Sequence, residues 1–161
     1  IFDHHFVEFV YPGGAIISSQ CRHQKGCMSR VSESFQGTLG NSYTDAGNKA
    51  ILNSYSSGVL YKHNGEDDKN PYQVEHDKLF ASIRSGGHIN DAEYGAKSTM
   101  TAILGRMATY TGKVITWEEA MNSEKVLVPN EDGLSFDSIP PVVPDADGKY
   151  VIPVPGVTKL V

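Results

Sequence analysis

The central third of the chain constrains the fold most, because it combines helix-start signals with apolar residues at helical spacing. Asn70 is a favoured N-cap residue, Pro71 is favoured at the first helical position, and the glycine pair at 86–87 ends the apolar pattern. We therefore expect a helix over residues 71–85. Its apolar face consists of Tyr72, Leu79, Phe80 and Ile83.

The same kind of signal predicts two further helices. Asn90, with Glu93 three residues later, is a variant of the capping box and predicts a helix over residues 91–110. Thr116 and Glu119 have the same spacing and predict a short third helix directly after Thr116.

The residues before this helical block read as β-strands. Alternation over residues 2–11, the Pro12-Gly13-Gly14 turn and a β-branched run over residues 15–22 predict a hairpin. Further strands are predicted over residues 28–36, 42–44, 49–55 and 58–63. Their connections are too short for helical crossovers, so the strands should be antiparallel. We expect an α+β fold, with one open, mainly antiparallel sheet of about five or six strands and helices packed on one face.

The composition changes near residue 128, where the α+β domain over residues 1–128 is expected to end. Six of the eight prolines follow, interspersed with Val and Ile. Proline cannot donate to a sheet ladder or occupy a helix interior. We therefore expect residues 129–161 to form an extended arm that packs on the domain or on a partner subunit.

Charge and hydropathy exclude some classes of partner. The net charge of −5 argues against a nucleic-acid or anionic-membrane surface, and no apolar run is long enough to cross a bilayer. The chain begins at Ile1 rather than Met, so we expect truncation or processing of a longer protein. The cell compartment, cytoplasm or periplasm, then depends on the part upstream.

Four blocks of sequence carry a family resemblance: FVEFVYPGGAIISSQCRH, VSESFQGTLG, NPYQVEHDKLFASIRSGGHINDAEYGAKSTMTAILGRMATYTGK and VITWEEAMNS. They resemble successive blocks of the C-terminal domain of the glucose–fructose oxidoreductase / inositol dehydrogenase (Gfo/Idh/MocA) family. The resemblance implies a domain that shapes the substrate pocket and mediates oligomerisation. The parent protein would be an NAD(P)-dependent oxidoreductase acting on a sugar, cyclitol or related polyol.

The parts of that family that perform the chemistry are absent from this chain. The Gly37-Thr38-Leu39-Gly40 segment lacks the third glycine of a dinucleotide-binding loop and leads into strand sequence rather than a helix. No Glu-Lys-Pro occurs, and Asp3-His4-His5 does not match the family's Asp/His helix. We therefore expect no catalytic or cofactor-binding residues here. NAD or NADP would belong to the full-length parent, and the chain alone would be inactive.

The candidate substrate-binding residues are Arg22, His23 and Lys25, which close the second predicted strand and concentrate hydrogen-bond donors. Such donors can position hydroxyls or a carboxylate of a small sugar-like substrate. A solvated hairpin end is the alternative reading. His4, His5 and Glu8 do not predict a metal site, because adjacent strand residues point to opposite faces.

Partners follow from the expected open sheet. Its second face would carry more apolar residues than one helical layer covers, so we expect a dimer or tetramer formed through that face. Two alternatives stay open: a non-catalytic binding or assembly module with the same sheet, and a domain of an NAD-dependent glycosidase branch.

Overall fold

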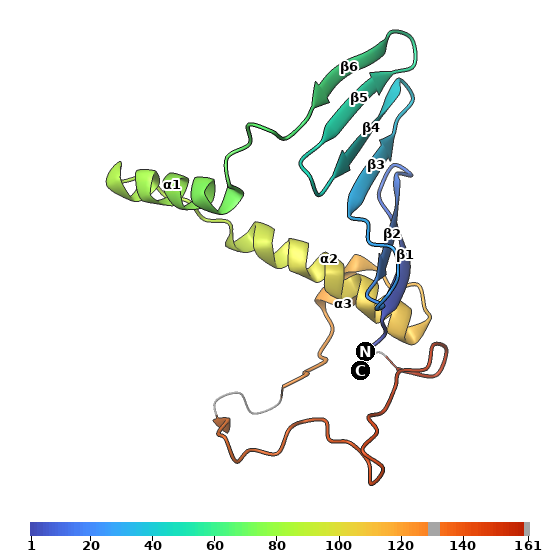
Figure 1. Ribbon diagram of the computed structural model, residues 1–161. Coiled ribbons are helices and arrows are strands. Elements are labelled where there is room, and N and C mark those ends of the chain that lie inside the picture. Colours follow the sequence, from blue (N-terminus) through green and yellow to red (C-terminus); the bar gives the residue numbers. More distant parts are fainter. Residues whose placement is uncertain (129–132, 160–161) are drawn as a thin grey trace. The chain divides into compact units, whose positions relative to one another are not determined.

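The computed structural model describes residues 1–128 and 133–159 and contains six strands followed by three helices (Figure 1). The chain divides into two compact units. One unit consists of Ile1–Lys25 with Asp91–Val161, and the other of Gly26–Asn90. Every strand pair is antiparallel and neither sheet closes into a barrel, so the expected α+β class with open antiparallel strands is confirmed.

The strands form two sheets rather than the single sheet that the sequence predicts. β1 and β2 make a two-stranded sheet, and β3–β6 make a four-stranded sheet. Short turns impose pairing between consecutive strands, and every pair joined by a short turn does pair. The longer segment over residues 23–31 imposes no such pairing between β2 and β3, and the division between the two sheets falls there.

In the first unit, β1 (His4–Val10) and β2 (Ile16–Arg22) form the predicted hairpin. The amide of Tyr11 donates to the carbonyl of Ala15 at 2.8 Å, which closes the turn around the Pro12-Gly13-Gly14 sequence. The register sets His4 opposite Arg22 and Val10 opposite Ile16. Because cross-strand partners share a face, the register also decides which side chains lie together.

Helix α2 (Ala92–Thr111) packs on one face of β1. Val7 and Phe9 point toward α2 and are half-buried, and Gly105 is buried beneath them. A Cβ built on Gly105 would lie 3.1 Å from the Phe9 ring, so the absence of a side chain lets helix and strand approach closely. Among the described residues, the buried apolar side chains are Met107 and Ala120, on α2 and α3.

Helix α2 starts and ends within one residue of its predicted bounds. The prediction that Asn90 caps this helix is wrong by one residue, because the N-cap is Asp91, whose own side chain makes no capping hydrogen bond. Its last carbonyl, that of Thr111, accepts from the Gly156 amide at 2.7 Å, so the arm contacts the end of the helix. The described part of the arm, residues 133–159, contains no extended helix or strand. The first predicted arm residues, 129–132, and the last two, 160–161, lie outside the described residues.

Helix α3 (Trp117–Met121) begins with the predicted capping box. The Thr116 hydroxyl accepts from the Glu119 amide at 3.1 Å, and the Glu119 carboxylate accepts from the Thr116 amide at 2.8 Å. Both bonds satisfy amides that a helix start otherwise leaves without partners. The helix packs on α2, with Ala120 buried.

In the second unit, β3 (Ser32–Gln36), β4 (Gly40–Asp45), β5 (Ala50–Ser54) and β6 (Gly58–His63) form a meander in chain order. The register between β5 and β6 shifts between Leu52 and Asn53. A Cβ built on Gly40 would lie 2.0 Å from the Asn53 carbonyl oxygen. Only glycine fits at this start of β4.

Helix α1 (Pro71–Arg84) follows the sheet within the same unit. Asn70 caps it as predicted, because its Oδ1 accepts from the amides of Tyr72 and Gln73 at 2.9 and 3.4 Å. The predicted apolar stripe is exposed on this helix. Residues 26–90 are all described, and within them α1 packs against none of the four strands.

No helix among the described residues is both long and apolar enough to cross a lipid bilayer.

Candidate functional site

The three predicted substrate-binding residues lie at the open end of the β1–β2 hairpin. Arg22 is the last residue of β2, and His23 and Lys25 lie one and three residues beyond it. All three are exposed. The His23 amide donates to the Asp3 carbonyl at 2.7 Å, which continues the pairing one step beyond the strands.

A carboxylate lies in this cluster, and the sequence reasoning missed it. Asp3 accepts from His4 Nδ1 at 2.7 Å and from Gln24 Nε2 at 3.0 Å. The hydrogen bond from His4, and next that from Gln24, holds the pKa of the Asp3 carboxyl below its ordinary value. We call Asp3, His4, Arg22, His23 and Gln24 the hairpin-end cluster. The position of the hairpin turn sets the strand register. Continuing that register one residue beyond the strand ends places Asp3 opposite His23, so the sequence alone could have indicated this pairing.

His4 and His5 lie on opposite faces of β1, as strand alternation requires. His5 faces α2, where its Nδ1 lies 2.8 Å from the Thr109 hydroxyl. That hydroxyl donates its own proton to the Arg106 carbonyl at 3.1 Å, so it accepts from His5. The His5 ring also stacks on Tyr110, with centroids 6.1 Å apart. These contacts join β1 to α2.

The second unit also has a cleft that the sequence did not indicate. It has a volume of about 500 Å³ and is open to solvent. The turn between β4 and β5 forms one wall, and the loop leading from β6 into α1 forms the other. We call it the β4–β5 cleft, and its lining residues are Thr44, Asp45, Asn48, Lys49, Ala50, Asp68, Lys69, Pro71 and Val74.

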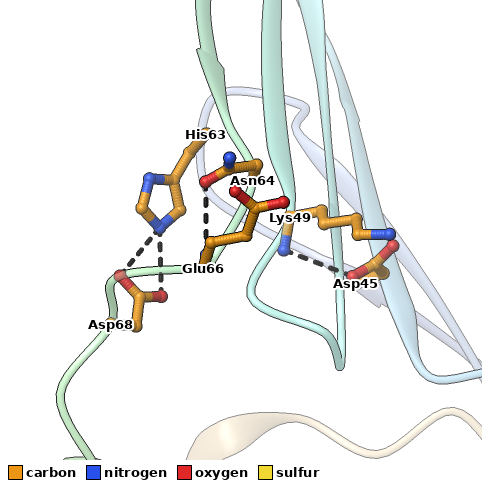
Figure 2. A network of polar contacts seen from close by, with 6 residues as sticks. All are labelled: Asp45, Lys49, His63, Asn64, Glu66 and Asp68. Carbon is orange, nitrogen blue, oxygen red and sulfur yellow. Dashed lines mark hydrogen bonds and ion pairs between the residues drawn. The ribbon is translucent and has the colours of Figure 1, made fainter.

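Hydrogen bonds within each segment constrain the two walls of this cleft separately (Figure 2). In the turn, Asp45 Oδ1 accepts from the amides of Gly47 and Lys49 at 2.9 and 3.3 Å. In the loop, His63 Nε2 lies 2.9 and 3.0 Å from the two oxygens of Asp68. A Cβ built on Gly65 would lie 2.6 Å from the Gly47 carbonyl oxygen, so turn and loop are in direct contact.

The charged groups of the cleft are not equally engaged. The Asp68 carboxylate is paired with His63, and Asp45 Oδ1 accepts from two amides of its own turn. The ammonium groups of Lys49 and Lys69 make no hydrogen bond or ion pair with any residue that the structure describes. The cleft lining therefore includes two ammonium groups without a partner among the described residues, beside two carboxylates that already accept hydrogen bonds.

The residues that the structure describes contain no group of three or more His, Cys, Asp or Glu side chains arranged to hold a metal ion. Comparison with protein-family models, with curated proteins and with solved structures finds no match for this chain. The family resemblance of the four sequence blocks accordingly stays a prediction.

Proposed function

We propose that the chain is the substrate-side and assembly domain of an NAD(P)-dependent oxidoreductase that acts on a sugar, cyclitol or related polyol. The nicotinamide cofactor and the catalytic residues would be supplied by a Rossmann domain of a longer polypeptide. The resemblance of the four sequence blocks to the Gfo/Idh/MocA C-terminal domain supports this proposal. In this chain those blocks form β1–β2, β3, α1–α2 and α3.

The observation that carries the substrate part of the proposal is the hairpin-end cluster. A polyol hydroxyl both donates and accepts, so its recognition requires acceptors beside donors. Asp3 supplies an ionised acceptor, because its pKa is lowered, and Arg22 and His23 supply donors at the same end of the hairpin. The negative charge of Asp3 favours a neutral polyol over a sugar acid at this position.

The assembly part of the proposal rests on the outer face of the hairpin, the face that points away from α2. Phe6, Val10 and Ile16 lie on this face and are 58%, 72% and 60% exposed. Packing against an identical strand pair from a second subunit is the commonest way to bury the apolar residues of an exposed strand pair. Arg22 ends the same face, so assembly and substrate contacts would be adjacent.

Nucleotide binding tests the proposal. We expect isothermal titration calorimetry to detect no binding of NAD or NADP to the 161-residue chain, because it contains no phosphate-binding loop. The longer polypeptide that includes it should bind one of the two nucleotides. Micromolar binding by the 161-residue chain would contradict the proposal that a separate domain binds the cofactor. If the longer polypeptide binds neither nucleotide, the proposed oxidoreductase function is rejected.

A non-catalytic assembly module is the second candidate function. It is favoured by the exposure of apolar residues on both the hairpin and α1. The same titration separates the candidates, since an assembly module would oligomerise while its parent bound no nicotinamide.

A further inference from the structure

We propose that the β4–β5 cleft binds a small organic oxyanion, a carboxylate or a phosphate monoester, through the ammonium groups of Lys49 and Lys69. This inference does not rest on the proposed oxidoreductase, because it concerns a different surface in the second unit. Three features of the cleft carry it: its constrained walls, the unequal use of its charged groups, and its apolar side.

The two walls are constrained before any ligand arrives. Asp45 Oδ1 accepts from two amides of the β4–β5 turn, which sets the backbone at Lys49. The His63–Asp68 pair constrains the facing loop, and Lys69 follows Asp68 directly (Figure 2). Contact between Gly65 and Gly47 joins the two loops. Such preorganisation lowers the entropy that binding must overcome.

The unequal engagement of the charged groups favours an anionic ligand. Both oxygens of Asp68 lie within hydrogen-bond distance of His63, and Asp45 Oδ1 is occupied by backbone amides. Lys49 and Lys69 have no such partners among the described residues. Ammonium groups donate and never accept. The complementary ligand group is therefore an oxyanion, which forms the stronger, charge-assisted kind of hydrogen bond.

Helix α1 contributes an electrostatic field to the cleft rather than hydrogen-bond donors. Its N-terminus borders the cleft through Pro71 and Val74. Pro71 has no amide proton, and Asn70 already accepts from the amides of Tyr72 and Gln73. What remains is the positive end of the helix dipole, which favours an anion nearby. Pro71, Val74 and Ala50 provide apolar surface for the carbon skeleton of an organic ligand. A volume of about 500 Å³ suits a small metabolite.

The test is a titration of the 161-residue chain at constant ionic strength, monitored by the amide chemical shifts in NMR spectra. The probes are inorganic phosphate and acetate, which distinguish the two anion sources, with myo-inositol as the neutral comparison. We expect saturable shifts at Thr44, Asn48 and Val74 with at least one of the two anions, and none with myo-inositol. The Lys49→Gln and Lys69→Gln variants should each bind about tenfold more weakly, the loss of one charge-assisted hydrogen bond.

Lys62→Gln is the matched control. Lys62 is an exposed residue of β6 and does not line the cleft, so this variant removes the same charge from the same sheet. It should retain the affinity of the unchanged chain. Equal weakening by all three variants, shifts that never saturate, or equal binding of myo-inositol would overturn the proposal. The amide spectrum of each variant without ligand reports whether the fold is retained.

Discussion

Gly112 ends helix α2 in the left-handed region, with φ of 68°. A Cβ at this position would also lie 2.9 Å from Pro155 Cβ and 3.0 Å from the Gly156 nitrogen. The Gly112→Ala variant should therefore lose about 1–2 kcal/mol of unfolding free energy from the left-handed backbone alone, and more from the clash with the arm. Urea unfolding measures the loss as a lower midpoint with an unchanged slope.

The matched control lies on the same helix. Gly95 is exposed, and a Cβ built on it meets nothing within 4 Å. Gly95→Ala should stabilise the chain by about 0.5–1 kcal/mol, because alanine is the better helix former. The two substitutions are chemically identical, so opposite signs would localise the cost to the helix end. A loss at both positions would contradict the explanation.

At the scale of single elements, the start of α3 gives a prediction about pH. Hydrogen bonds from the Thr116 backbone amide, and next from its hydroxyl, hold the pKa of the Glu119 carboxyl below its ordinary value of 4.5. A carboxylate with a lowered folded-state pKa stabilises the fold above its unfolded pKa. That contribution is lost as the pH falls through the folded-state pKa.

The Glu119→Gln variant tests this linkage. Its stability deficit relative to the unchanged chain should be largest at neutral pH and should shrink as the pH falls below about 4. Urea midpoints measured across that range report the deficit. Glu118→Gln is the control, since Glu118 also lies in the first turn but makes no capping bond that the structure describes. A deficit that stays constant with pH would contradict the role of the ionised Glu119.

One turn occurs twice in the chain, and it shows that a few neighbouring residues are enough to specify a turn. Residues 45–49 (DAGNK) and 145–149 (DADGK) make the same hydrogen bonds: the first Asp side chain accepts from the third and fifth amides. In both turns the fourth residue, Asn48 or Gly148, has positive φ. Asp, Asn and Gly are the residues that such turns require. The sequence therefore contains this turn twice, in otherwise unrelated surroundings.

At the scale of the whole molecule, the balance of exposed and buried apolar surface predicts self-association. Met107 and Ala120 are the buried apolar side chains of the described residues, whereas Phe6, Val10 and Ile16 are exposed on one face of the hairpin. We expect light scattering coupled to size exclusion to give a dimer or tetramer at low micromolar concentration. The mass should not change with salt, because an apolar interface is not screened.

The Val10→Lys variant provides the control for that measurement, since it places charge on the outer face without touching the face that packs on α2. It should shift the population toward a monomer of 17.5 kDa. An unchanged chain that is a clean monomer would reject the proposed assembly. An oligomer that survives Val10→Lys would show that another surface forms the interface.

The candidate sites differ in how far they could be predicted. Arg22 and His23 could be singled out because a strand end and a run of donors are both local patterns. Asp3 joined them only through strand pairing, which the turn position makes partly inferable. Lys49 and Lys69 could not be connected at all, because their proximity depends on the sheet and on the contact of Gly65 with Gly47.

The sequence by itself determined the helices α1, α2 and α3, the hairpin and the turns, because caps, prolines and glycines act within a few residues of themselves. Only the tertiary structure decided that the strands divide into two sheets and that two loops form a cleft. It also decided that the arm reaches the end of α2 at Gly156. Those outcomes depend on contacts between residues far apart in the chain. Such contacts carry an entropic cost of loop closure, which local sequence patterns do not reveal.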